Sequence, residues 1–221
     1  MLARAALGAA EGLWLRADRQ DGGRGRMGRQ WESPVGNLYA STIIRISVSD
    51  PAPASLAFVA ALAAFDTVTA VAPDIPVQIK WPNDILTADG AKLCGILLER
   101  ANDAIIAGFG INLFNHPLLP DRPTADLSSR GANPPDAQAV CQILADNLAR
   151  RLLQWRQQPL GNLLRAWESA AHRQGSALRV NLPDGDCLEG LFAGLADDGA
   201  LKLRLADGEI RAIHAADIFL I

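Results

Sequence analysis

The sequence predicts an α+β domain over residues 1–173, followed by a small antiparallel β-barrel over residues 174–221. Predicted helices and strands both occur as far as residue 171, and this mixture gives the α+β class. After Gly175, short apolar strands are separated by Pro-Asp-Gly, Asp-Asp-Gly and Ala-Asp-Gly turns, the pattern of a small, tightly turned barrel. Apolar residues make up 49% of the 221 residues, which is enough to bury a sizeable core.

The first third of the chain contains two predicted strands between two predicted helical segments. Residues 1–10 have the composition of a helix end, and residues 13–18 form a short strand that runs into a glycine-rich loop. Residues 37–47 are rich in β-branched side chains and predict a second strand. The alanine-rich residues 54–71 then predict a helix that ends before Pro73.

The middle of the chain predicts three further strands, over residues 77–81, 92–100 and 104–113. Turn residues separate these strands. Pro82-Asn83-Asp84 indicates one turn, and Asp89-Gly90 favours a hairpin.

The segment before the C-terminal barrel is predicted to be a loop followed by two helices. Residues 115–135 contain five prolines and are expected to be a loop. Asp136 is suited to cap a helix whose apolar residues recur at helical spacing, namely Val140, Leu144, Leu148, Leu152 and Trp155. A shorter helix is expected over residues 160–171.

Charge and cysteine content restrict the class of protein. The net charge of −3 gives no general preference for nucleic acid or an anionic membrane, so anion binding has to be local. The cysteines Cys94, Cys141 and Cys187 are odd in number and form no CxxC pair, which fits a reducing cytoplasm. Glu11 and Arg16 interrupt the apolar start of the chain, so neither a signal peptide nor a membrane span is predicted.

The arginine loop, residues 22–31, combines four glycines with three arginines and ends at Trp31. Arg24 and Arg26 are two positions apart, so an extended backbone directs both to one side. An anionic ligand would turn their mutual repulsion into attraction, and glycine lets the backbone approach carboxylate or phosphate oxygens. The alternatives are a solvated loop without a specific role and a single-stranded nucleic-acid site in which Trp31 stacks on a base. The acidic composition of the chain disfavours the nucleic-acid site.

Two other segments carry candidate site residues. Lys80 comes at the end of a predicted strand, on the face opposite Val77 and Ile79, and it is either an active group or a solvent-exposed strand lysine. Residues 108–112, GFGIN, place two glycines in a strand, a pattern that often marks close approach of a ligand. They lack the full dinucleotide-binding fingerprint, and Asn112 either binds a ligand or caps the strand.

Other common chemistries are not indicated by the sequence. The histidines His116, His172 and His214 are isolated and have no metal-ligand spacing. Neither a GxSxG nor a Walker A motif occurs, so the corresponding hydrolase and P-loop functions are excluded.

Four motifs in order resemble those of the biotin protein ligases: GRGRMGRQW at 23–31, KWPND at 80–84, KLCGILLE at 92–99 and GFGINL at 108–113. The resemblance covers essentially the whole chain. It implies a mixed or antiparallel sheet like that of class II aminoacyl-tRNA synthetases, with a C-terminal SH3-like barrel. It also implies ATP- and Mg²⁺-dependent formation of biotinyl-5′-AMP, followed by transfer of biotin to a lysine of a biotin carboxyl carrier protein or domain.

The resemblance also assigns roles to individual residues, residue by residue within the matching motifs. Lys80 and Arg26 are expected to be catalytic. The expected biotin-binding residues are Gln20, Gly23, Arg24, Gly25, Arg26, Lys80 and Gly95. The expected residues on the ATP and adenylate side are Arg26, Arg29, Trp31, Lys80 and Asn112.

The implied partners are biotin, ATP and the carrier domain, with neither DNA nor membrane, and the protein is expected to be a monomer or homodimer. Family members carry a Ser/Thr-Asn-type segment ahead of the position at which this sequence begins, so the sequence is expected to be short at its amino end. A lipoate or octanoate ligase or transferase of the same fold is the nearest alternative. A non-catalytic nucleic-acid-binding protein is the alternative from another class. The combination of GRGRMGR with KWPND favours biotin.

Overall fold

The computed structural model describes residues 1–120 and 122–221 and contains two antiparallel sheets. The larger sheet has six strands in the order β1-β2-β6-β5-β4-β3. Its strands are β1 (Trp14–Ala17), β2 (Leu38–Arg45), β3 (Val77–Lys80), β4 (Asp84–Thr87), β5 (Lys92–Ala101) and β6 (Ala104–Ile111). The α+β class predicted from the sequence is therefore confirmed.

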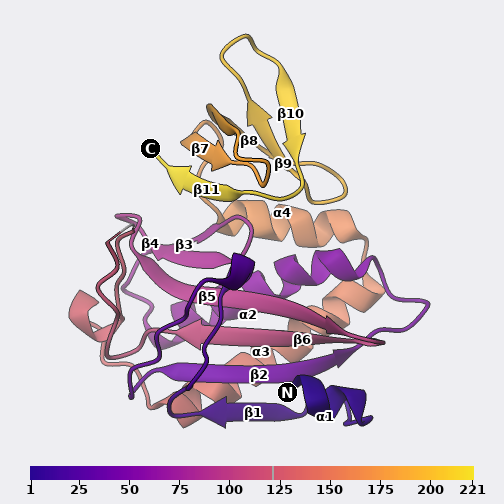
Figure 1. The fold of residues 1–221 in the computed structure, drawn as a ribbon, viewed down its shortest axis with the longest axis vertical. Coiled ribbons are helices and arrows are strands. Elements are labelled where there is room, and N and C mark those ends of the chain that lie inside the picture. The colour runs from indigo at the N-terminus through magenta and orange to yellow at the C-terminus, as the bar shows by residue number, and fades with distance from the viewer. Residues whose placement is uncertain (121) are drawn as a thin grey trace.

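Helices cover one face of this sheet, and the arginine loop crosses the other (Figure 1). The helices on the covered face are α2 (Leu56–Val71), α3 (Ala137–Gln157) and α4 (Leu160–Ala170). The short helix α1 (Leu2–Ala6) lies at one end of the opposite face, where Ala5 packs against Ile43 of β2 and Ile106 of β6. The remainder of this opposite face is available to form a site.

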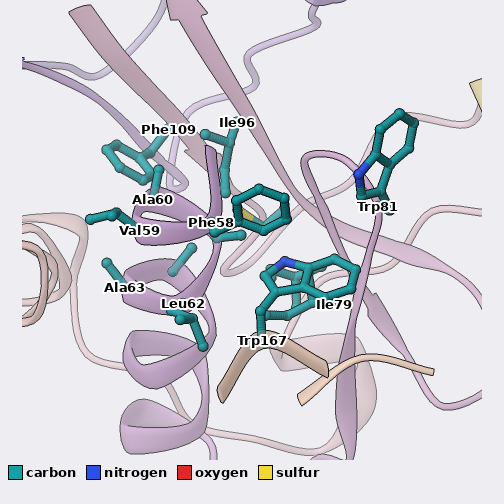
Figure 2. Close-up of a cluster of buried hydrophobic side chains, with 14 of the residues drawn as sticks. Phe58, Val59, Ala60, Leu62, Ala63, Ile79, Trp81, Ile96, Phe109 and Trp167 are labelled. Atoms are coloured by element: carbon teal, nitrogen blue, oxygen red, sulfur yellow. The ribbon is translucent and has the colours of Figure 1, made fainter. Parts of the chain in front are cut away.

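The core is centred on α2, whose alanines allow close packing against the sheet and against α3. Figure 2 shows Phe58 of α2 beside Trp167 of α4, with Ile79 and Trp81 next to them. The rings of Phe58 and Trp167 meet edge to face, with centroids 5.7 Å apart. The segment Pro53–Val71 is long and apolar enough to cross a membrane, but 61% of its apolar window is buried in the fold, as expected for a core helix.

The second sheet has five strands in the order β10-β9-β8-β7-β11. They are β7 (Ala177–Asn181), β8 (Cys187–Leu195), β9 (Leu201–Arg204), β10 (Ile210–Ile213) and β11 (Asp217–Leu220). Within the described residues β10 and β11 are the two ends of this strand order, and the five short antiparallel strands are consistent with the small β-barrel predicted from the sequence. Its apolar side shares one continuous core with the larger sheet, and the Trp81 indole N–H reaches the Gly199 carbonyl oxygen at 3.4 Å.

The strand β4 was not predicted. Its four residues lie between two turns, and they are all buried, so no alternation of polar and apolar residues distinguishes them. Pro82 and Asn83 do form a turn, as expected, but Asp84 is already the first residue of β4. The hairpin expected at Asp89-Gly90 is present, and Gly90 adopts a positive φ of 85° there.

Asp136 caps α3 as predicted, since its carboxylate accepts a hydrogen bond from the Ala139 backbone N–H at 2.8 Å. Asp136→Ala is expected to destabilise the protein by about 1 kcal/mol, because one helix N–H loses its partner. The change is measured as the free energy of unfolding in urea. An exposed aspartate outside helix caps, Asp74, gives the control variant Asp74→Asn, which should leave that free energy unchanged within about 0.5 kcal/mol.

Candidate active site

A cavity of about 480 Å³ opens on the face of the large sheet that the helices leave free. Four parts of the chain enclose it. They are the arginine loop, the turn between β3 and β4, the residues Pro117, Leu119, Arg122 and Thr124, and β11 of the C-terminal sheet. The cavity therefore lies where the two sheets and the arginine loop meet.

The arginine loop is held in a defined hairpin by its own backbone. The Gly25 N–H donates to the Arg29 carbonyl oxygen at 2.7 Å, and the Trp31 N–H donates to the Gly23 carbonyl oxygen at 2.9 Å. A Cβ atom on Gly23 would lie 2.4 Å from the Trp31 carbonyl oxygen, so a side chain there is incompatible with this closure. Arg26–Gly28 form a 3₁₀ turn at the tip.

The base of the loop is fixed by the buried Ser33. Its hydroxyl accepts a hydrogen bond from the Gln20 N–H at 2.9 Å and donates one to the Gln20 carbonyl oxygen at 3.1 Å. Both backbone groups of Gln20 are thus satisfied, and the Gln20 side chain lines the cavity.

Two glycines on neighbouring strands form a flat floor. Gly95 of β5 lies directly opposite Gly110 of β6, and the indole of Trp31 rests on both. A Cβ atom would lie 2.7 Å from Trp31 at Gly95 and 2.4 Å from it at Gly110, so any side chain would displace the indole. The Trp31 indole N–H is buried and has no hydrogen-bond partner within residues 1–120 and 122–221. The two glycines therefore make room for the indole of Trp31 on the floor of the cavity.

Lys80, Lys92 and Asp84 form a largely buried cluster of charges in the cavity. The Asp84 carboxylate is buried between the two amines, with Oδ1 2.7 Å from Lys92 Nζ and Oδ2 3.2 Å from Lys80 Nζ. Burial alone would raise the pKa of Asp84, but the charges of Lys92 and Lys80 outweigh it and lower the pKa to about 2. One carboxylate thus orients two lysines and leaves a net positive charge.

The thiol of Cys94 is close to these charges but is not a candidate nucleophile. Burial raises the pKa of Cys94 far above its usual value, so the thiol stays protonated.

The C-terminal sheet supplies one wall of the cavity. Lys80 Nζ donates to the Ile218 carbonyl oxygen at 3.1 Å and lies over the ring of Phe219. The guanidinium of Arg29 makes a two-point contact with the Asp217 carboxylate, with Nη1 3.2 Å from Oδ1 and Nη2 against Oδ2. β11 therefore orients a lysine of the site and anchors the arginine loop.

Two polar residues complete the nucleotide-side positions predicted from the sequence. Arg26 Nη1 lies 3.4 Å from Asn83 Oδ1, which joins the tip of the arginine loop to the turn after β3. Asn112 is buried and donates from Nδ2 to the Ala125 carbonyl oxygen at 2.9 Å. Asn112 lines the cavity, and its buried Oδ1 has no hydrogen-bond partner in the described parts of the chain.

The structure brings almost all of the predicted site residues to this one cavity. Those that line it are Gln20, Arg24, Gly25, Arg26, Arg29, Trp31, Lys80, Gly95 and Asn112. Gly23 of the arginine loop is buried and does not line the cavity. The ligand contacts of these residues remain predictions.

Sequence reasoning missed Lys92 and Asp84. Lys92 begins the KLCGILLE motif, but strict alternation along a strand places it on the face opposite Gly95. The pairing of β4 with β5 is irregular at this point, and Leu93 and Cys94 are both buried in the core. The alternation is broken, and Lys92 joins Gly95 on the cavity side.

Within the described residues no group of three or more His, Cys, Asp or Glu side chains is arranged to hold a metal ion. The His116 ring contacts Asp126 at 2.5 Å, and no third side chain of this kind joins the pair within residues 1–120 and 122–221.

Comparison with known proteins gives consistent matches along the chain. Residues 9–113 match the biotin/lipoate A/B protein ligase family, and residues 175–221 match the biotin protein ligase C-terminal domain. The chain is 34% identical to a biotin–[acetyl-CoA-carboxylase] ligase of Paracoccus denitrificans, over 96% of this chain and 92% of that protein. A ligase of the same name from Mycobacterium tuberculosis is also 34% identical, over 99% and 83% of the two chains.

A solved structure shares the fold. Biotin protein ligase from Aquifex aeolicus, in complex with biotin and ATP, superposes with a TM-score of 0.86 at 24% identity and covers 100% of this chain and 94% of its own.

Proposed function

Since the chain belongs to the biotin protein ligases, within the biotin/lipoate A/B protein ligase family, we propose that it activates biotin with ATP and transfers it to a carrier lysine. The observation that carries the proposal is the cavity itself. It combines a floor of two glycines, covered by the Trp31 indole, with Arg26, Lys80 and Lys92, which supply positive charge. Both reactants of the first step are anions, so this charge is what the chemistry requires.

In the first step, a biotin carboxylate oxygen attacks the α-phosphorus of ATP. The bond from that phosphorus to the bridging oxygen breaks, and pyrophosphate leaves with the electron pair, which yields biotinyl-5′-AMP. Lys80 and Lys92 hold the two anions together and stabilise the charge that develops on the phosphoryl oxygens. Their orientation comes from Asp84, and that of Lys80 also from the Ile218 carbonyl oxygen.

In the second step, the neutral amine of a lysine on a biotin carboxyl carrier domain attacks the carbonyl carbon of the anhydride. The carbon–oxygen bond to the phosphate breaks, AMP leaves, and the amine proton passes to solvent or phosphate. The adenylate reacts with water unless it is covered, and we assign this covering role to the arginine loop and Trp31. Arg24, Arg26 and Arg29 place positive charge on the covering segment.

Mg²⁺ is proposed to arrive with ATP, bound mainly by phosphate oxygens. Mg²⁺ commonly keeps several waters and binds through substrate phosphates and one or two carboxylates, so a protein cage of ligands is unnecessary. Asp84 is a buried carboxylate of the cavity, but it is already held by two lysines. We place the reaction in the cytoplasm, where ATP is available and where the three free cysteines remain reduced.

The direct test is the transfer reaction. The purified chain is mixed with biotin, Mg-ATP and a biotin carboxyl carrier domain, and the carrier is probed with streptavidin. Labelling that requires both biotin and ATP is expected. Labelling with lipoate and ATP but not with biotin would assign the chain to lipoate ligation instead.

Arg26→Ala is expected to accelerate release of biotinyl-5′-AMP by about 10- to 100-fold, because one charge-assisted hydrogen bond to the adenylate is lost. Labelling of a bystander protein that lacks a carrier domain measures the release. Arg100, exposed on β5, provides the control variant Arg100→Ala, for which bystander labelling should match the wild type. Equal release from Arg26→Ala and wild type would assign adenylate retention to other residues.

A further inference from the structure

The cavity has a second end, which the motifs of the sequence did not single out. On β5 the residues Gly95, Leu97 and Glu99 alternate onto the cavity face, opposite Gly110, Gly108 and Ile106 of β6, respectively. At about 3.3 Å per residue, Glu99 lies about 13 Å along the strand from Gly95. The cavity thus extends from the glycine floor to Glu99.

The two ends carry opposite charge. The amine of Lys92 lies over the floor, 3.2 Å from the position that a Cβ atom on Gly95 would take. Glu99 has no hydrogen bond or ion pair within residues 1–120 and 122–221, whereas Asp84 and Asp217 of the same cavity are both paired with cations. The carboxylate of Glu99 is therefore a hydrogen-bond acceptor without a donor.

We propose that Glu99 accepts hydrogen bonds from the ureido N–H groups of biotin and is a specificity-determining residue of this ligase. The inference rests on the proposed function. A substrate whose carboxylate meets Lys80 and Lys92 points its other end along β5 toward Glu99. The ureido ring of biotin offers N–H donors at that end, and the dithiolane ring of lipoate and the alkyl chain of octanoate offer none.

A second polar group supports this placement of the ureido ring. Ser41 of β2 faces the cavity, and its Oγ is 3.5 Å from where a Cβ atom on Gly108 would lie. A hydroxyl there can donate to the ureido oxygen while Glu99 accepts from nitrogen. The side wall between them is apolar, since it consists of Leu97 and Ile106.

Discrimination between biotin and lipoate follows from the free-energy cost of leaving the Glu99 carboxylate without a hydrogen-bond donor. Lipoate would remove water from the Glu99 carboxylate without supplying a hydrogen-bond donor. A site that hydrogen-bonds a polar group of its substrate strongly rejects an analogue without that group, whereas an apolar site only weakly rejects an analogue that lacks a methylene. Glu99 therefore lowers the affinity for lipoate and raises that for biotin. The preference is measured as the ratio of kcat/KM for biotin to kcat/KM for lipoate. A general loss of stability would lower both values and leave their ratio unchanged.

The experiment compares biotin and lipoate as substrates for ATP-dependent pyrophosphate release by wild type, Glu99→Gln and Glu99→Leu. We expect the ratio of kcat/KM for biotin to that for lipoate to fall about tenfold or more in Glu99→Leu, mainly through KM for biotin. Glu99→Gln keeps one neutral acceptor and should lie between. The control Glu209→Gln changes an exposed glutamate directly before β10 and should keep the wild-type ratio.

The outcomes separate this inference from the proposed function. If the wild type activates biotin and the ratio is unchanged in Glu99→Leu, the role of Glu99 is wrong and the ligase function stands. If the wild type activates neither acid, both proposals are wrong. A measurement without variants adds a further check: desthiobiotin keeps the ureido ring, so it should compete with biotin far better than lipoate does. Competition no better than that of lipoate would also overturn the role of Glu99.

Discussion

Replacement of Lys92 by methionine is expected to lower the rate of biotinyl-5′-AMP formation by about 10²- to 10³-fold, the range observed when one preorganised charge or donor is removed from a transition state. Methionine keeps much of the length and apolar bulk of lysine and removes only the charge. Lys92 is the lysine whose amine lies directly over the glycine floor and against Trp31. It therefore reaches the place where carboxylate and phosphate meet.

The measurement is biotin-dependent release of pyrophosphate, with Lys202→Met as the control. Lys202 lies on β9 in the C-terminal sheet and does not line the cavity, so its variant should keep the wild-type rate. Circular dichroism of each variant verifies the fold. A folded Lys92→Met protein with the wild-type rate would contradict this role of Lys92.

Lys80→Met is the informative comparison, because the resemblance of the KWPND motif to the biotin protein ligases makes Lys80 the expected catalytic lysine. Lys80 is shared among Asp84, the Ile218 carbonyl oxygen and the Phe219 ring, so more of its hydrogen-bonding capacity is used within the protein. We expect Lys80→Met to slow adenylation as well, by no more than Lys92→Met does. The opposite order would show that Lys80 is the principal lysine of the site.

The difference between these lysines shows what could be predicted from the sequence. The arginine loop, KWPND and GFGIN are short motifs whose residue types alone indicate binding sites. The structure brings residues of all three to one cavity. Lys92 depends on an irregular pairing between β4 and β5, and β4 itself has no periodic pattern. Its side-chain direction is set by tertiary structure, and strict alternation along β5 would place it on the face opposite Gly95.

The contribution of the C-terminal sheet to the site could not be predicted from the sequence either. Its strands and turns were predictable from apolar residues separated by Asp-Gly turns. The contacts of Asp217 with Arg29 and of Ile218 with Lys80 join residues nearly two hundred and nearly one hundred and forty positions apart. One of these contacts uses a backbone carbonyl oxygen, which carries no residue-specific signal.

The largest loss of stability is expected for Asp84→Asn, about 3–5 kcal/mol in the free energy of unfolding at neutral pH. The variant leaves two ammonium groups facing each other in a buried position, without the carboxylate that lies 2.7 Å and 3.2 Å from them. For a chain of 221 residues this corresponds to a fall in Tm of roughly 10 °C. The adenylation rate should fall as well, because Lys80 and Lys92 lose their common orienting group.

The dependence on pH distinguishes loss of this charge from loss of packing. The pKa of Asp84 is lowered in the fold to about 2 from 3.8, so its ionised form stabilises the protein fully above about pH 4. As the pH falls through 3.8 toward 2, the unfolded chain takes up a proton before the folded one does, and wild type loses this stabilisation. The difference in unfolding free energy between wild type and Asp84→Asn should therefore narrow from pH 4 to pH 2. A difference that stays constant over this range would mean that Asp84 stabilises the fold by packing and not by its charge.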